Sequence, residues 1–192
     1  MNNRTRLLTL VPVIAGAMVP AIAVAHPGHG VSGDFMAGVV HPLSGLDHVL
    51  MIVAISAWAS LLAPAGRVVV ATCLAAFVAL GAAWPVSVSG SLLEAAIALT
   101  VVGAGILLAF GRRWPLWATG AVAAMFAVIH GFAHGVEGPA GSVAYVPGLA
   151  LSTGGVALGV SFLAARLQSG RGWLRIAGIA GATAGVTALI TA

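Results

Sequence analysis

The sequence predicts an all-α integral membrane protein, a six-helix transmembrane bundle that follows an N-terminal signal peptide. Of its 192 residues, 60% are hydrophobic and 6% are charged, and the mean hydropathy is +1.11. A water-soluble domain of this size cannot bury so large an apolar share, so most of the surface is expected to face lipid. A spanning segment must satisfy its own backbone hydrogen bonds. Because the period-two alternation of a barrel does not appear, the spans are expected to be helices.

The first 25 residues have the three parts of a secretory signal. Arg4 and Arg6 form a basic start, residues 7–24 are apolar, and the small residues "AVA" resemble a cleavage site. We expect cleavage after Ala25, with an uncleaved first helix as the alternative. Cleavage leaves residues 26–40 as an exported segment that begins "HPGHG".

Six apolar segments follow, separated by prolines, glycines and arginines. Each has close to the ~20 residues that cross ~30 Å of hydrocarbon as a helix. They form a transmembrane domain over residues 41–192, with approximate spans at 42–63, 67–84, 91–110, 115–136, 146–165 and 173–191.

The arginines indicate the orientation of these spans. The turns after the first, third and fifth spans carry arginine, whereas those after the second and fourth carry none. The positive-inside rule then places the arginine-bearing turns in the cytoplasm and both mature termini outside, in the periplasm. A signal that exports the N-terminus predicts the same orientation, so the expected location is the bacterial inner membrane. The arginines concerned are Arg67, Arg112, Arg113, Arg166, Arg171 and Arg175.

The composition also excludes several classes of function. The net charge of +4 comes from arginines without a polar basic face, so a nucleic-acid partner is not expected. No glycine-rich phosphate loop is present, so no nucleotide is expected. The single cysteine, Cys73, excludes a disulfide framework or a cluster of thiolates.

The histidines and acids gather at the outer level, opposite the arginines. Asp47 and His48 lie roughly 8–9 Å below the outer end of the first span, and His130 and His134 lie about 10 and 5 Å below the outer end of the fourth. His130, His134 and Glu137 are spaced i, i+4 and i+7, so they share one helix face. The first and fourth spans therefore present polar residues at the same level.

Two local features accompany these residues. Pro42 is expected to start the first span, which leaves His41 in the preceding turn. Gly131 and Gly135 flank the polar face of the fourth span. They allow the first and fourth spans to approach closely, or let backbone line a small cavity.

Imidazole and carboxylate are the ligands that suit Ni²⁺, Co²⁺ and Zn²⁺, and the lack of thiolates argues against Cu⁺. An unpaired aspartate at the bilayer centre costs ~2.5–3.5 kcal/mol, and no basic residue lies at this level to pair with Asp47, Glu94 or Glu137. A divalent cation is the expected counter-charge. The predicted metal site, between the first and fourth spans, comprises His41, Asp47, His48, His130, His134 and Glu137.

Other polar residues are candidates for lesser roles. Glu94, Ser44 and Thr153 are candidates to support the ligands or to line the path, with ordinary helix–helix hydrogen bonding as the alternative. His26 and His29 are an auxiliary capture site or part of an inert linker. Pro27 removes the backbone N–H that chelation by amine and amide would use.

With these residues assembled, the chain resembles the HupE/UreJ family of nickel permeases along essentially its whole length. The stretch "HPLSGLDH" from His41 to His48 matches that family's HPxxGxDH signature, and "HGFAHGVE" from His130 to Glu137 resembles its second histidine motif. The resemblance implies movement of Ni²⁺, or in some members Co²⁺, from periplasm to cytoplasm for hydrogenase or urease. It implies that the six predicted ligands are needed, Glu137 with the least support. Many relatives carry a further histidine in the fifth span, where this chain has "GLALSTGGVALGV", which leaves the number of ligands open.

The function predicted from the sequence is a secondary permease or facilitator for a divalent cation, Ni²⁺ first, then Co²⁺ and then Zn²⁺. The ion is the substrate, and no prosthetic group is expected. The alternative is an intramembrane hydrolase that uses metal-bound water with Glu137 or Asp47 as base. The loops between the predicted spans are short, which argues against a substrate pocket, so an enzyme is not expected. A third hypothesis is a metal sensor or scaffold. The expected partners are the ion and the lipid bilayer, and the sequence indicates no oligomeric state.

Overall fold

The computed structural model describes residues 31–84, 86–139, 142–167 and 172–191, and these residues form helices and turns without a strand. A short helix α2 (Val31–Val40) and a 3₁₀ turn η1 (His41–Leu43) lead into α3 (Leu46–Ala59). The longer helices that follow are α4 (Pro64–Ala83), α5 (Gly90–Phe110), α6 (Leu116–Glu137), α7 (Tyr145–Arg166) and α8 (Gly172–Thr191). The expected signal peptide, His26 and His29 lie outside the described residues.

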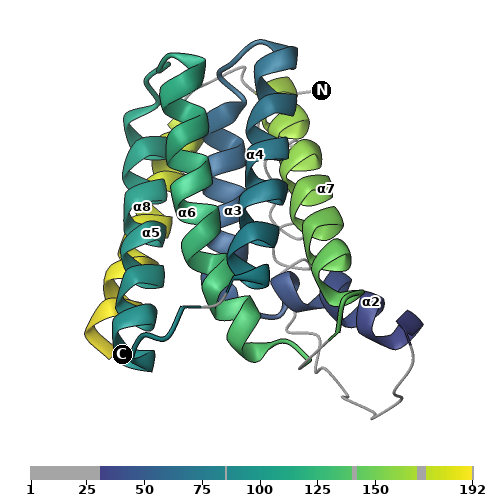
Figure 1. Cartoon of the computed structure of the whole chain (residues 1–192). Coiled ribbons are helices and arrows are strands. Elements are labelled where there is room, and N and C mark those ends of the chain that lie inside the picture. The colour runs from purple at the N-terminus through teal and green to yellow at the C-terminus, as the bar shows by residue number, and fades with distance from the viewer. Residues whose placement is uncertain (1–30, 85, 140–141, 168–171, 192) are drawn as a thin grey trace.

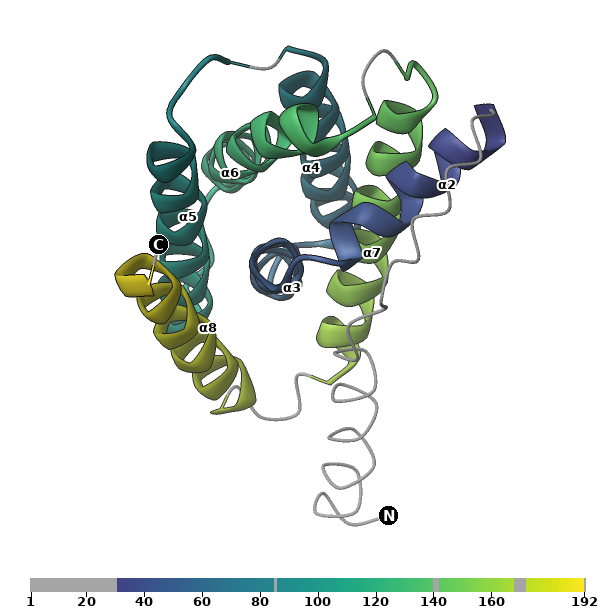
Figure 2. The ribbon, with the colours of Figure 1, turned by 90° about the horizontal axis from the view of Figure 1, so that it is seen from below.

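Helix α3 runs through the middle of the bundle. Seen along the bundle axis, the longer helices stand around it, with α8 beside α5, then α6, α4 and α7 (Figure 2). Helix α3 packs against all five of them. From α3 to α8 successive helices run in opposite directions, so α3 begins at the end of the bundle where α6 and α8 finish (Figure 1). The start of α3 therefore lies at the same end of the bundle as the last turns of α6 and α8.

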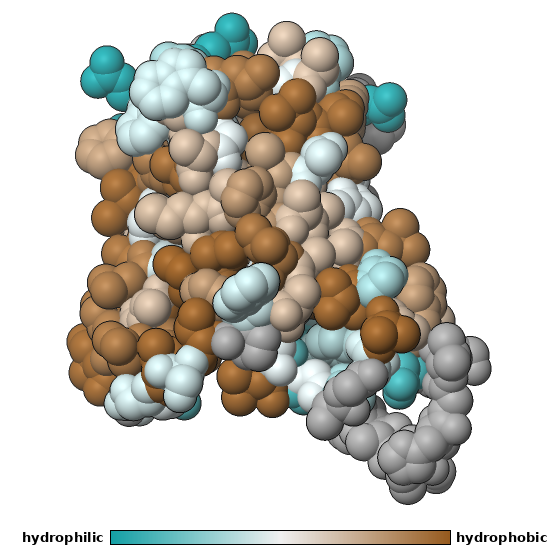
Figure 3. Space-filling model, in the orientation of Figure 1, coloured by the Kyte–Doolittle hydropathy of each residue, from teal (hydrophilic) through white to brown (hydrophobic). Residues whose placement is uncertain are grey.

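The helices have the length and composition of membrane spans. Helices α4 to α8 are each long and apolar enough to cross a bilayer, and α2 with η1 and α3 makes a sixth span if the bent pair is counted as one. Apolar residues cover the middle of the visible face, and hydrophilic residues gather towards its two ends (Figure 3). Large apolar side chains point outward along the bundle, among them Phe110, Leu151 and Ile176, which are 63–75% exposed. The protein is thus an all-α multi-pass membrane protein.

The first span differs from the continuous helix expected over 42–63. Helix α3 has 14 residues, or about 21 Å, and α2 meets it at an angle of 73°. Pro42 lies inside the 3₁₀ turn rather than at the start of the span, and Gly45 has the extended backbone (φ −96°, ψ 125°) that caps α3. The expectation that Pro42 starts the helix is therefore wrong. The other five helices begin and end within three residues of the expected ranges.

Small residues bring α6 against α4. A Cβ atom added to Gly131 would lie 2.4 Å from the Val78 carbonyl oxygen, and one added to Gly135 would lie 2.6 Å from the Ala82 carbonyl oxygen. These glycines were expected to let the first and fourth spans approach, or backbone line a cavity. Their close contacts are instead with α4, the second span. The histidine face of α6 is thereby left free to face α3.

The end of the bundle opposite the histidines carries the described arginines and aromatic anchors. The Trp58 indole N–H donates a 2.9 Å hydrogen bond to the Arg112 carbonyl, which fixes the last turn of α3 to the α5–α6 turn. Arg67 donates to the Leu62 carbonyl at 3.0 Å and lies 5.3 Å from the centre of the Phe162 ring. The segregation of arginine from histidine and acid seen in the sequence is thus a segregation between the two ends of the bundle.

Candidate metal centre

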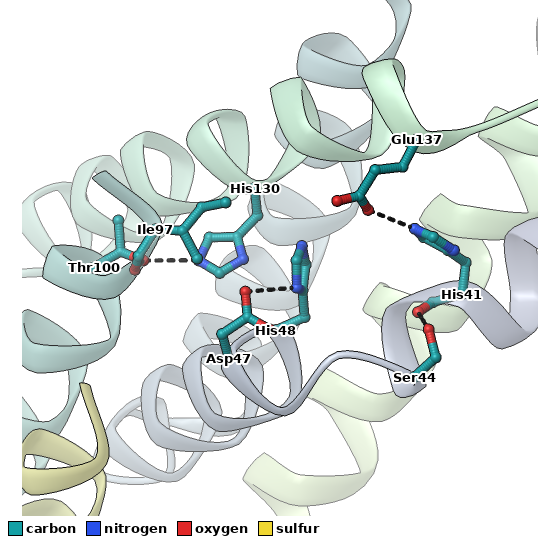
Figure 4. A network of polar contacts seen from close by, with 8 residues as sticks. All are labelled: His41, Ser44, Asp47, His48, Ile97, Thr100, His130 and Glu137. Atoms are coloured by element: carbon teal, nitrogen blue, oxygen red, sulfur yellow. Dashed lines mark hydrogen bonds and ion pairs between the residues drawn. The ribbon is translucent and has the colours of Figure 1, made fainter. Parts of the chain in front are cut away.

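The six predicted ligands meet where α3 begins and α6 ends. The 3₁₀ turn carries His41, the first turn of α3 carries the next two ligands, and the last two turns of α6 carry the remaining three (Figure 4). The periodicity of α6 places its ligands on one face, and the break at Gly45 turns His41 back towards that face. The six predicted ligands are His41, Asp47, His48, His130, His134 and Glu137.

Three of these residues form an inner triad, which we define as Asp47, His48 and His130. Each offers one ligand atom, and these atoms lie within 4.8 Å of one another. Asp47 Oδ2 accepts a 3.0 Å hydrogen bond from His48 Nδ1, and the His48 and His130 rings meet edge to face with centroids 4.5 Å apart. The side chain of His48 is 8% exposed and His130 is 1% exposed. The two histidines of this triad are therefore buried, while Asp47 is 33% exposed and lines the pocket.

The other three form an outer triad, which we define as His41, His134 and Glu137. Their ligand atoms also lie within 4.8 Å of one another. His41 Nε2 donates to Glu137 Oε2 at 3.0 Å, and the two side chains are 29% and 53% exposed. Glu137 is seven residues beyond His130 along α6, so its backbone lies about 10 Å nearer the end of that helix.

The two triads touch through their histidines. The rings of His48 and His134 have centroids 4.3 Å apart, and those of His41 and His134 are 4.9 Å apart. Metal–nitrogen bonds of about 2.0–2.1 Å place ligands up to about 4.2 Å apart across an ion. Small side-chain movements are therefore sufficient to close either triad around an ion. The sequence predicted one site, whereas the structure divides the same residues into two adjacent groups.

Buried imidazole nitrogens are left without hydrogen bonds. His48 Nε2, His130 Nδ1 and His134 Nδ1 are all inaccessible and have no partner among the described residues. A buried polar atom without a partner costs free energy, and its presence calls for an explanation. His48 donates from Nδ1 to a carboxylate, so its Nε2 carries a lone pair, and a bound cation would satisfy it.

Two carboxylates have partners that the sequence did not predict. Asp47 and Glu137 were expected to lack any basic neighbour, but each accepts a hydrogen bond from an imidazole, those of His48 and His41. A neutral imidazole supplies a hydrogen bond and no positive charge. The carboxylates therefore orient histidines and still contribute negative charge to the site.

A pocket of about 430 Å³ opens onto the site. Five of the six predicted ligands line it, and the fully buried His130 does not. Glu94 also lines the pocket but joins neither triad, and α8 contributes Thr191. A water molecule occupies about 30 Å³ in the liquid, so the pocket is large enough for a small cation with its first shell of water.

The remaining candidates have different positions. Ser44 lines the pocket, and its hydroxyl donates to the His41 carbonyl at 2.6 Å, which stabilises the 3₁₀ turn. Thr153 is 1% exposed and does not line the pocket, and its hydroxyl has no partner among the described residues. It lies on α7, which packs against α3.

Sequence reasoning missed two neighbours of the ligands. Thr100 lies 2.7 Å from His130 Nε2, and Tyr145 packs edge to face on His41 with centroids 5.8 Å apart. The available signal for Thr100 was a single hydroxyl within the apolar run "AIALTVVGAG" of α5. No spacing in the sequence connected that hydroxyl to α6.

The chain is similar to known proteins along most of its length. Residues 14–189 match the family described as HupE / UreJ protein. The chain is also 36% identical over 182 residues to Protein HupE of Rhizobium leguminosarum bv. viciae, an alignment that covers 92% of this chain and 95% of that protein. No solved structure matches the chain.

Proposed function

Because the chain belongs to the HupE/UreJ family, we propose that it is a secondary permease or facilitator for a divalent transition-metal cation. The preferred substrate is Ni²⁺, with Co²⁺ second, and the direction is from periplasm to cytoplasm across the inner membrane. The observation that carries the proposal is the set of buried imidazole nitrogens without partners where α3 and α6 face each other. Nitrogen and carboxylate oxygen together suit these metals.

The two triads supply successive positions for the ion. A hydrated cation enters the pocket and exchanges part of its water for the outer triad, whose glutamate is half exposed. His134 and His48 are in ring contact, so an ion held by His134 reaches the inner triad by exchanging one imidazole for the next. Such stepwise exchange avoids a fully dehydrated and unliganded ion at any point.

Beyond the inner triad the path leads towards the arginine end of the bundle. Thr153 is a candidate to line it, since its buried hydroxyl has no other partner among the described residues. The membrane potential is a sufficient driving force. A divalent cation moving inward gains about 4.6 kcal/mol per 100 mV, which corresponds to roughly a thousandfold accumulation at equilibrium.

Uptake of ⁶³Ni²⁺ by proteoliposomes that contain the purified protein tests the proposal. We expect His48→Ala and His130→Ala to abolish uptake, because each removes a buried ligand from the inner triad. Glu137→Gln is expected to raise the ion concentration for half-maximal uptake while retaining most of the maximal rate, because it weakens only the first capture step. Thermal unfolding of each variant in detergent identifies any loss of fold. Unchanged uptake in both histidine variants would overturn the proposal.

The same vesicles distinguish transport from the two rival hypotheses, a sensor or scaffold and a hydrolase. A sensor or scaffold that acts through other proteins carries no ion when it is the sole protein in the membrane. A hydrolase would bind the metal without moving it. No observation on the described residues favours hydrolysis over transport, and membership of the family favours transport.

A further inference from the structure

We propose that Thr100 is a positioning residue that holds His130 in the tautomer and ring orientation that present Nδ1 to the metal. This inference rests on the proposed function, since it assigns a role to a neighbour of the inner triad. It gives α5, which already lines the pocket through Glu94, a direct contact with a predicted ligand, while the ligands themselves come from η1, α3 and α6.

The Thr100 hydroxyl lies between two polar atoms in the core of the bundle. Its Oγ1 is 2.6 Å from the Ile97 carbonyl oxygen and 2.7 Å from His130 Nε2. Thr100 is 3% exposed and His130 is 1% exposed, so no solvent is available to complete their hydrogen bonds. The two short contacts must therefore be satisfied by the hydrogen atoms of these groups themselves.

The threonine has one hydroxyl hydrogen, and it belongs to the contact with Ile97. Two oxygen atoms 2.6 Å apart are stable only with a hydrogen between them, and the Ile97 carbonyl has none to give. Donation to the carbonyl of a preceding residue is also the usual behaviour of threonine within a helix. Thr100 Oγ1 is then an acceptor towards His130, so His130 Nε2 carries the hydrogen and donates it.

Protonation at Nε2 leaves His130 Nδ1 with a lone pair. That atom is fully buried and has no hydrogen-bond partner among the described residues. Figure 4 shows this nitrogen on the side of the ring that faces His48, while the opposite nitrogen faces Thr100. Rotation of the ring about its bond to Cβ would break the bond to Thr100. The hydroxyl thus fixes both which nitrogen is free and where it points.

Groups that hold a ligating histidine in this way change metal affinity by about 10–100-fold when they are removed. Thr100→Val keeps the shape of the side chain and removes the acceptor, whereas Thr100→Ser keeps the acceptor and removes a methyl group. Thr119→Val is the matched control. Thr119 is also buried, on α6 itself, and its hydroxyl bonds only to the Pro115 carbonyl among the described residues.

The experiment measures equilibrium binding of ⁶³Ni²⁺ to the purified full-length protein in detergent, together with ¹⁵N NMR of its histidine rings. We expect Thr100→Val to weaken binding about 10–100-fold. Thr100→Ser should restore it to within a few fold, and Thr119→Val should leave it unchanged. In the metal-free wild-type protein, the His130 resonances should show a protonated Nε2 and an unprotonated Nδ1.

Three results would overturn the inference. The first is wild-type affinity in Thr100→Val, and the second is an equal loss in the serine variant. The third is a metal-free wild-type protein whose His130 carries its hydrogen on Nδ1, a measurement that does not depend on any variant folding. If His130→Ala also binds and transports normally, the proposed function fails. If only Thr100→Val is normal, the proposed function stands and the positioning role fails.

Discussion

Asp47 is adjacent to His48 in the chain, and its carboxylate accepts the Nδ1 hydrogen of that histidine at 3.0 Å. With the hydrogen on Nδ1, His48 Nε2 keeps a lone pair that is available to a metal ion. The carboxylate of Asp47 adds negative charge to the inner triad. We predict that Asp47→Asn lowers Ni²⁺ affinity about 10–100-fold, because an amide retains an acceptor oxygen but loses the charge. Isothermal titration with the detergent-solubilised protein measures the change.

The control is Asp34→Asn. Asp34 lies in the first turn of α2, at the same end of the bundle, but it does not line the pocket. Equal losses in the two variants would show that the effect comes from the overall negative charge of this end of the protein and not from the contact with His48.

At the scale of residues, the sequence identified the candidate ligands of α6 because residues at regular helical spacing lie on one face of the helix once it forms. His130, His134 and Glu137 share a face of α6 as their i, i+4 and i+7 spacing predicted. The separation into two triads could not be predicted in this way, since it depends on how far η1 turns back at Gly45. The role of Thr100 depends on the contact between α5 and α6, which leaves no periodic signal in a single sequence.

At the scale of elements, the α4–α6 contact determines where the histidine face points. A Cβ at Gly131 would lie 2.4 Å from the Val78 carbonyl and 2.8 Å from the Gly81 Cα, both backbone atoms that cannot rotate away. We predict that Gly131→Ala destabilises the protein by roughly 1–3 kcal/mol, because the added methyl group forces the two helices apart. Thermal unfolding in detergent measures the loss.

Gly120→Ala is the matched substitution on the same helix. A Cβ there would meet only the Cys73 sulfur, at 3.8 Å, which is an ordinary contact. Alanine also has a higher helix propensity than glycine, so this variant should be as stable as the wild type or more stable. Comparable destabilisation in both variants would mean that the close approach at Gly131 has no special importance.

The element that the sequence described least well is the first span. Its apolar run from 42 to 63 reads as one helix, but α3 covers only Leu46–Ala59, and the preceding segment Asp34–Leu43 meets it at an angle of 73°. The break has local causes in Pro42 and Gly45, and a long-range one in the contact between α2 and α7. A Cβ at Gly148 would lie 2.2 Å from the Phe35 carbonyl, so α2 is held tightly across α7. Composition indicates that a segment is apolar, whereas the direction of its first turns depends on such contacts.

At the scale of the whole molecule, charge is divided between the two ends of one apolar bundle. Acids and histidines surround the pocket at one end, and the described arginines lie at the other, beyond the last turn of α3. A pocket lined by carboxylates attracts cations, while a cluster of arginines repels them. Under the proposed function, the direction of transport depends on which end faces the periplasm, and the positive-inside rule predicts that the pocket lies on that side.

Labelling of single cysteines in whole cells tests that assignment. In a Cys73→Ala background, which removes the native thiol, Val143→Cys places a thiol at the pocket end, in the α6–α7 connection, where Val143 is 86% exposed. Ala65→Cys places one at the arginine end, on an exposed residue in the first turn of α4. We predict that a membrane-impermeant maleimide, admitted to the periplasm, labels Val143→Cys in intact cells and Ala65→Cys only after the inner membrane is permeabilised. Full labelling of both after permeabilisation shows that each thiol is reactive. The reverse pattern would place the pocket in the cytoplasm, and the same ligands would then receive ions for export.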